Sequence, residues 1–230
     1  MGSKETSWSY SDETGPDQWA EIDAEYELCE TGSRQSPIDI TGARPGSFPR
    51  IATDYHPETV TVENNGHAIE VVPGNSRSSI RLAGTRYDLV QFHLHAPSEE
   101  LVDGEAFDAT VHMVHASEDG QLAVIALLVE TGAANPVLDF KVPDQPGEES
   151  QVERPIDPRD LLPEDDDAYR YEGSLTTPPC TEGVIWTVFR QPITMSPQQL
   201  EALQAAHDGN ARPVQPLTDR RIVSGRALDG

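Results

Sequence analysis

The segment QFHLH at residues 91–95 constrains this chain most, because it sets two histidines two positions apart inside an apolar stretch. Successive side chains of a β-strand point to opposite faces, so residues two apart share a face. His93 and His95 therefore present two imidazoles on one side of a predicted strand. His112 follows in a second apolar run, VHMVH, and an antiparallel neighbour would bring it alongside. Three neutral imidazoles that leave one position open are the ligand set of a catalytic zinc ion.

The remaining pattern indicates a β-rich domain with many turns. Apolar or alternating runs predict strands at residues 60–63, 67–72, 79–82, 87–95, 109–115, 122–129 and 184–190. Asn64-Asn65-Gly66 predicts a hairpin turn between the first two. Ser196, Pro197 and Gln199 carry the signature of a capping box, which predicts a helix through about residue 206. We expect helical turns near 17–22 and 158–162, and surface loops at 142–154 and 164–167.

Length and charge narrow the class of protein. At 230 residues, a single domain over 1–230 is expected, with residues 1–7 as a flexible segment. Forty acidic residues face sixteen basic ones, a net charge of −24. Such a chain is not expected to bind nucleic acid or an anionic membrane, since both need clustered positive charge. The charge indicates a solvated acidic surface, and a sharper hypothesis is adaptation to high salt, which screens self-repulsion.

Cellular location stays open from the residues alone. The N-terminus, MGSKETSWSY, lacks the apolar core of a signal peptide, and no apolar run reaches the ~20 residues of a membrane helix. Either the protein is cytosolic, or a signal was removed and residues 1–3 are a cloning remnant. Cys29 and Cys180 are either two buried thiols or a disulfide, which would contribute roughly 4–5 kcal/mol in the chain-entropy model.

An ordered set of motifs resembles the α-class carbonic anhydrases. These are GPDQW at 15–19, RQSPIDI at 34–40, NNGHA at 64–68, QFHLHAPSE at 91–99, VHMVH at 111–115 and EGSLTTPPCTEGVIW at 172–186. The resemblance implies a mainly β (α+β) fold, with a central twisted, mostly antiparallel sheet of about ten strands and short peripheral helices. It also implies a zinc enzyme that hydrates carbon dioxide to bicarbonate, with His93, His95 and His112 as the metal ligands.

The resemblance also assigns roles around the metal. Thr176 matches the threonine that accepts a hydrogen bond from zinc hydroxide, and Glu99 the glutamate that receives that threonine's proton. His67 matches the proton shuttle, which suits an ordinary histidine pKa near 6.5. Matching polar positions line the cavity, support its water network or hold a metal ligand: Tyr10, Asn65 and Gln91. Matching positions of the substrate pocket are Val114, Val124, Leu175, Thr177, Val184 and Trp186.

Two positions depart from the family pattern. Thr110 stands where a glutamate usually bonds the third zinc histidine, so we expect a weaker zinc site in which a water or Asp108 assists. Glu70 places a negative charge at a cavity position that is often neutral, and we expect it to raise the pKa of His67.

Partner, location and rival functions complete the expectations. Cys29 and Cys180 match the disulfide of secreted and bacterial members, which favours a periplasmic or secreted protein. Bacterial relatives are often dimers, so a homodimer is considered, with no nucleic-acid or membrane partner. The rival functions are a non-catalytic binding module of the same fold, a zinc esterase or other hydrolase, and a purely structural acidic protein.

Overall fold

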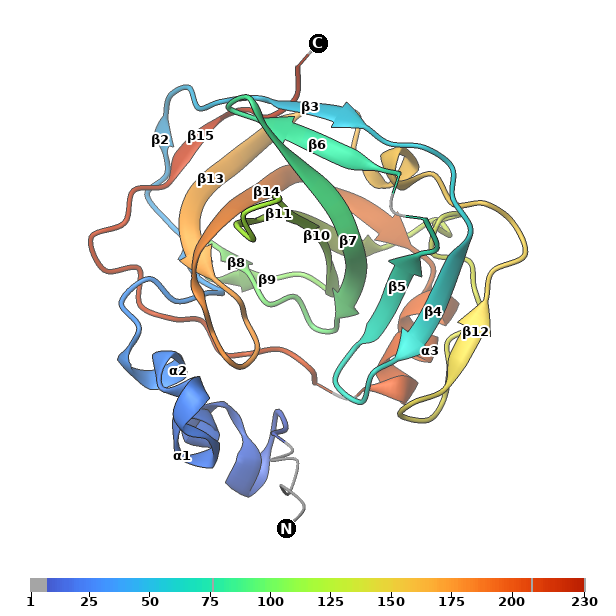
Figure 1. The fold of residues 1–230 in the computed structure, drawn as a ribbon, viewed down its shortest axis with the longest axis horizontal. Coiled ribbons are helices and arrows are strands. Elements are labelled where there is room, and N and C mark those ends of the chain that lie inside the picture. The colour runs from blue at the N-terminus through green and yellow to red at the C-terminus, as the bar shows by residue number, and fades with distance from the viewer. Residues whose placement is uncertain (1–7, 76, 208, 230) are drawn as a thin grey trace.

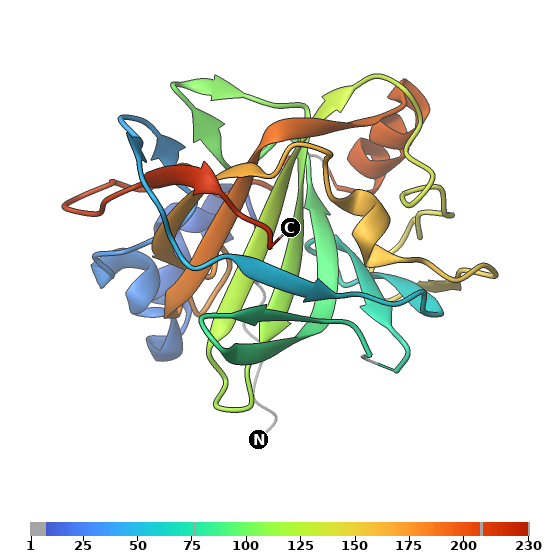
Figure 2. The same ribbon diagram turned by 90° about the horizontal axis from the view of Figure 1, so that it is seen from above.

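The computed structural model describes residues 8–75, 77–207 and 209–229, so the segment 1–7 expected to be flexible lies outside the described residues. A strongly curved twelve-stranded sheet forms the body of the molecule, as Figures 1 and 2 show from two sides. Short helices lie at its periphery. This architecture confirms the predicted mainly β fold with a large twisted sheet.

Ten strands follow one another across the sheet, and two more attach at its side. In spatial order the ten are β12 (Glu149–Gln151), β4 (Val60–Asn64), β5 (Ile69–Pro73), β7 (Thr85–His95), β10 (Ala109–Ala116), β11 (Leu122–Thr131), β14 (Glu182–Met195), β13 (Asp167–Ser174), β15 (Val223–Arg226) and β2 (Arg44–Pro45). At the side, β6 (Ser79–Leu82) pairs with both β7 and β3 (Ile51–Asp54). Among these described strands only β11–β14 and β15–β2 pair in parallel. A separate small sheet contains β1 (Asp39–Ile40), β8 (Leu101–Val102) and β9 (Glu105–Ala106).

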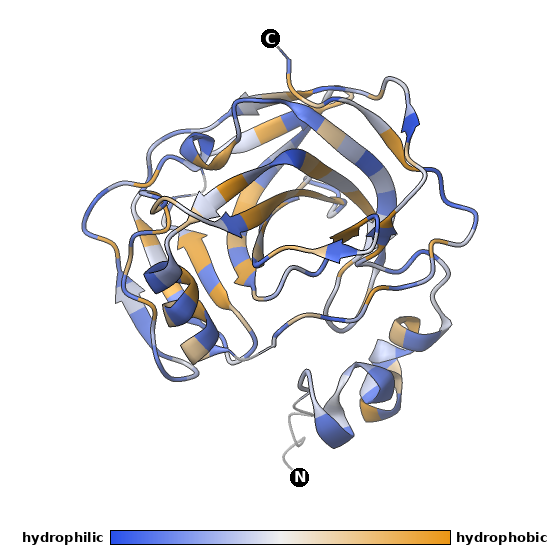
Figure 3. Cartoon of the chain, turned by 180° about the vertical axis from the view of Figure 1, so that it is seen from behind, coloured by the Kyte–Doolittle hydropathy of each residue, from blue (hydrophilic) through white to orange (hydrophobic). Residues whose placement is uncertain are grey.

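The alternation of side chains divides the core between the two faces of the sheet. Along β11, Ile125 and Leu127 pack into one apolar cluster, whereas Val124 and Ala126 pack into another on the opposite face. The predicted run of eight apolar residues is thus a central strand buried on both faces. Figure 3 shows hydrophobic segments concentrated along such inner strands.

The helix predicted after Ser196 is present as α3 (Pro197–Ala206). The Ser196 hydroxyl accepts from the Gln199 backbone N–H, and the Gln199 side chain accepts from the Ser196 backbone N–H, completing the capping box. The remaining helices are one turn each: η1 (Asp12–Thr14), η2 (Pro16–Gln18), α1 (Trp19–Ile22), η3 (Ala24–Tyr26), α2 (Leu28–Thr31) and η4 (Pro158–Leu161). Those before residue 32 form a unit that lies outside the curved sheet in Figure 1.

Three predicted boundaries are corrected by the structure. The strand predicted from residue 67 begins at Ile69, because the Asn65 side chain accepts hydrogen bonds from the backbone N–H groups of His67 and Ala68 and extends the turn. The predicted loop 142–154 contains β12, which pairs with β4 at the edge of the sheet. The acidic run at 164–167 ends inside β13, and its Asp166 is buried against Arg226.

Candidate metal centre

Two neighbouring strands bring the three predicted ligands together. β7 and β10 run antiparallel, and their register places His112 directly opposite His93. His95 lies two residues further along the same face of β7. The ring centroids of the three imidazoles are 4.8–5.3 Å apart, and one nitrogen from each ring lies within 4.8 Å of the other two. This group could therefore hold one metal ion.

A hydrogen bond at the opposite nitrogen of each ring determines which lone pair faces the centre. His93 Nδ1 lies 2.9 Å from the Gln91 side-chain oxygen, and His95 Nδ1 lies 2.6 Å from the Asn210 carbonyl oxygen. His112 instead uses Nε2, which lies 2.9 Å from Glu100 Oε1. Since carbonyl and carboxylate oxygens accept, these nitrogens carry the protons. The lone pairs of His93 Nε2, His95 Nε2 and His112 Nδ1 are left for a metal.

The chemistry of these nitrogens fits a cation. His95 Nε2 is buried and has no hydrogen-bond partner among the described residues, which a metal ligand would not need. Burial and the neighbouring His112 lower the pKa of His93 to about 3, and the same two causes bring the pKa of His95 well below its ordinary value. Both rings are therefore neutral near pH 7, as metal ligation requires.

Glu99, in the segment after β7, lies beside the three histidines and close to Thr176. Glu99 accepts a hydrogen bond from the Arg212 backbone N–H at Oε1, and its Oε2 lies 3.5 Å from His95 Nε2. Burial raises the pKa of Glu99 to about 7, although His112 and hydrogen bonds from Thr176 and the Arg212 backbone act in the opposite direction. Thr176 itself is buried in the turn between β13 and β14, so the predicted threonine and glutamate do meet.

The predicted apolar lining gathers beside the histidines. Trp186 on β14 packs edge-on against His112, with ring centroids 4.9 Å apart. The other four predicted apolar residues belong to the same cluster as Trp186: Val114, Val124, Leu175 and Val184. Val114 and Leu175 stay partly exposed, whereas Val124 and Val184 are buried. Thr177 is half-buried and its carbonyl accepts from the Cys180 N–H.

His67 and Tyr10 both pack against Trp8. His67 stacks on Trp8, and burial lowers its pKa. The expectation that Glu70 would raise this pKa is wrong, because the Glu70 carboxylate accepts instead from the Asn65 amide at 2.9 Å. Tyr10 packs against Trp19, and its hydroxyl is buried without a hydrogen-bond partner in the described parts of the chain.

The disulfide that the resemblance implied is present between Cys29 and Cys180. It ties the N-terminal helical unit to the turn that carries Thr176. Arg212 reinforces this junction, because its guanidinium donates to the backbone carbonyls of Cys29 and Ser36 and to the side-chain oxygen of Gln35.

The expectation that Asp108 assists His112 in place of the missing glutamate is wrong. Asp108 Oδ2 accepts from the backbone and hydroxyl of Thr131, so it does not serve His112. Thr110 is buried, and its hydroxyl has no partner among the described residues. Sequence reasoning missed Glu100, which bonds His112, and also Asn210 and Arg212. None of the three lies at strand spacing from a histidine, so the pattern gave no signal.

The remaining histidines lie outside the three-histidine centre. His115 is buried on the opposite face of β10 from His112, where its Nε2 meets the Tyr55 hydroxyl at 2.9 Å and its Nδ1 faces the Met113 and Ala123 carbonyl oxygens. His56 is partly exposed beside Asp54, and His207 follows the end of α3. These are structural or surface positions.

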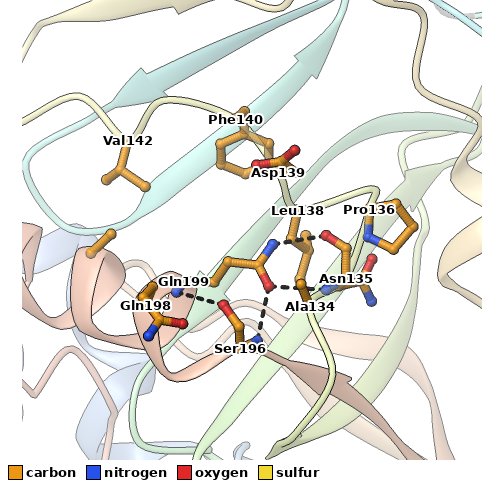
Figure 4. Close-up of a pocket in the computed structure, with 11 residues that line it drawn as sticks. Ala134, Asn135, Pro136, Leu138, Asp139, Phe140, Val142, Ser196, Gln198 and Gln199 are labelled. Atoms are coloured by element: carbon orange, nitrogen blue, oxygen red, sulfur yellow. Dashed lines mark hydrogen bonds between the residues drawn. The ribbon is translucent and has the colours of Figure 1, made fainter.

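A separate cavity of about 480 Å³ lies between α3 and residues 134–142 (Figure 4). None of the candidate site residues line it. Its wall is fixed by Gln199, whose side chain bonds the backbone of Asn135 at both N–H and carbonyl oxygen. Its lining residues are Ala134, Asn135, Pro136, Leu138, Asp139, Phe140, Val142, Ser196, Gln198, Gln199 and Ala202.

The fold and site define a mainly β protein with a three-histidine centre beside an apolar wall. The family model of eukaryotic-type carbonic anhydrases matches residues 14–226. A carbonic anhydrase of Neisseria gonorrhoeae is 39% identical, with 95% of this chain and 88% of the relative covered. The α-carbonic anhydrase of Thermovibrio ammonificans, solved with the inhibitor sulfanilamide, is 41% identical with a TM-score of 0.92, over 96% of this chain and all of the other. Dioscorin DB3L of Dioscorea polystachya is 40% identical, with 90% and 81% covered.

The chain therefore belongs to the α-carbonic anhydrase family, and it is an enzyme of the carbonic anhydrase class. Membership supports the hydration of carbon dioxide as its activity. Within the described residues, no helix has the length and apolar character needed to span a membrane.

Proposed function

We propose that this protein uses zinc to interconvert carbon dioxide and bicarbonate. The observation that carries this function is the convergence of three imidazole lone pairs, each oriented by a hydrogen bond at the opposite ring nitrogen. Three nitrogen ligands with one open position are typical of catalytic zinc. In carbonic anhydrases, the standard example of this chemistry, zinc makes hydroxide available near neutral pH by lowering the pKa of a bound water.

Thr176 and Glu99 would orient the hydroxide that a bound zinc would supply. Glu99 is fixed by the Arg212 backbone and meets Thr176, so the threonine hydroxyl has an acceptor for its own proton. The threonine oxygen is then left to accept a hydrogen bond from a nucleophile. Such an arrangement would orient a hydroxide toward the substrate carbon.

The apolar wall receives the substrate. Carbon dioxide is small and has no net dipole, so it binds where water is weakly held. Val114 and Leu175 remain partly exposed over a buried base that includes Val124, Val184 and Trp186. Thr177 marks the polar edge of this wall. The product bicarbonate is charged and leaves such a surface readily.

His67 carries the excess proton to the solvent. Its ring is half-buried beside Trp8, and this burial lowers its pKa, so near neutrality the imidazole is neutral and can take up a proton and release it readily to the solvent. Asn65 holds the turn that carries His67 through two backbone hydrogen bonds. With Tyr10, it supplies polar groups that support the connecting water chain.

The disulfide and the bacterial relatives favour a periplasmic or secreted location, where such bonds persist. We infer that residues 1–230 act as one domain, because the family model covers nearly all of the chain. A homodimer stays a prediction that sedimentation of the purified protein would test.

The decisive experiment is a stopped-flow assay of carbon dioxide hydration on purified protein, before and after zinc removal and after zinc is restored. We expect activity to vanish and return with the metal. The Thr176→Val variant should keep its zinc but lose much of the rate. Zinc binding without hydration would favour a binding module. Hydrolysis of an ester substrate at a rate far above carbon dioxide hydration would favour a hydrolase.

A further inference from the structure

Glu100 is a buried carboxylate that the reaction above does not use. Its side chain is fully buried, at 0% exposure, in the segment between β7 and β8. Burying a carboxylate costs free energy unless a partner compensates for the lost hydration. Within the described residues its recorded side-chain hydrogen bond is to His112 Nε2 at 2.9 Å, and its second oxygen has no partner there.

The contact comes from an unexpected part of the chain. Thr110 occupies the same face of β10 as His112, two residues away, which is where a side chain of this strand could orient the ring. Threonine is too short to do so, and its hydroxyl is unpaired among the described residues. Glu100 enters from the neighbouring segment and bonds the nitrogen that the strand leaves without a partner.

The bond determines how the third imidazole faces the centre. With its proton on Nε2 and held by Glu100, the His112 ring turns Nδ1 toward His93 and His95. A carboxylate at this position also makes the ring a stronger electron donor to a cation. Among the described residues, Glu100 alone forms a hydrogen bond with His112 Nε2.

We propose that Glu100 is a positioning residue for the metal, which fixes the His112 imidazole and sets how slowly the metal leaves. Glu100, in the β7–β8 segment, thereby supplies the hydrogen bond to His112 that Thr110 on β10 does not supply. This role rests on the proposed metal site but not on the reaction, because metal retention is measured without any substrate.

The test compares metal release from four variants loaded with zinc. Zinc loss to excess dipicolinate is timed for Glu100→Ala, Glu100→Gln, Thr110→Val and the double variant Glu100→Ala/Thr110→Glu. We expect Glu100→Ala to release zinc about 10–100-fold faster than the original protein. Glu100→Gln should fall between them, because an amide oxygen accepts the same bond without the charge. Thr110→Val, the matched control, should release zinc at the original rate.

The double variant separates positioning from a general role in folding. A glutamate at 110 lies on the face of His112, so it should restore slow release to within a few-fold of the original protein. The visible spectrum of the cobalt-substituted protein should change in Glu100→Ala and return in the double variant. Unchanged zinc release in Glu100→Ala, or fast release that the glutamate at 110 does not correct, would overturn this role. A protein that retains zinc but fails to hydrate carbon dioxide would overturn the proposed reaction alone.

Discussion

The indole of Trp8 lies flat on the imidazole of His67, with ring centroids 3.6 Å apart and the planes within 8° of parallel. The stacked ring covers part of the imidazole and thereby contributes to the burial that lowers the pKa of His67. In the proposed shuttle role, the rate at which His67 gives up its proton would depend on this pKa, so Trp8 would influence that rate without contacting the three metal-binding candidates.

We expect Trp8→Ala to raise the pKa of His67 toward its ordinary value of about 6.5. The ring would gain access to water, which favours its charged form. Titration of the His67 ring proton by nuclear magnetic resonance measures the change, with His67→Ala as the assignment control. An identical pKa in both proteins would show that the burial comes from other neighbours.

His115 should make stability depend on pH independently of the metal centre. Burial lowers its pKa to about 4, whereas the unfolded chain has the ordinary value near 6.5. Between these two pH values the unfolded chain binds the extra proton. The stabilisation is therefore complete above pH 6.5 and is lost as pH falls toward 4, by about 3 kcal/mol.

Urea unfolding of the metal-free protein at several pH values tests this. His115→Asn keeps a donor near the position of Nδ1 but cannot titrate, so its stability should fall less steeply between pH 6.5 and 4. The variant His56→Asn, at a partly exposed position, is the control. Equal slopes in all three proteins would contradict the assignment to His115.

Reduction of the Cys29–Cys180 disulfide should cost stability and loosen the N-terminal unit. The bond closes a sequence separation of 151 residues, for which the chain-entropy model gives roughly 4–5 kcal/mol. The double variant Cys29→Ser/Cys180→Ser should unfold at lower urea concentration and be cleaved by protease before β1. Reductant should have this effect on the original protein and none on the double variant. Equal stability with and without the bond would refute the expectation.

Salt should stabilise the folded protein. The net charge of −24 is spread over a chain with only sixteen basic residues, so most surface carboxylates repel one another. Added ions screen this repulsion. We expect the urea midpoint to rise as sodium chloride increases from about 0.05 M to about 1 M, and potassium chloride to act equally. A midpoint that does not depend on salt would remove the support for salt adaptation.

Local sequence patterns predicted the strands whose polar and apolar residues alternate and the helix that begins with a capping box. The strands around His93 and His112 and the helix from Pro197 have strong periodic or capping signals, and they lie where predicted. Strand β13, with the sequence DAYRYEGS, was not predicted, because its charged and small residues mask the alternation. The two-residue strands β1, β2, β8 and β9 are too short to leave any periodicity.

The residues of the candidate site also differ in whether a local sequence pattern could identify them. The three ligands and Gln91 could be assigned because strand spacing or motif carries them. Glu100 and Asn210 could not, because they reach the histidines from irregular segments whose path depends on tertiary packing. Asn210 is 115 residues from His95 in sequence, and such a contact is encoded by the whole fold rather than by a local motif.

The hydrogen bond between the Asn210 carbonyl and His95 also determines when during folding the three-histidine centre becomes complete. While β7 and β10 are paired but the segment around Asn210 has not yet docked, this acceptor is missing. The His95 ring is then free to rotate. A metal that needs all three rings in place would therefore be held firmly only after this segment has docked.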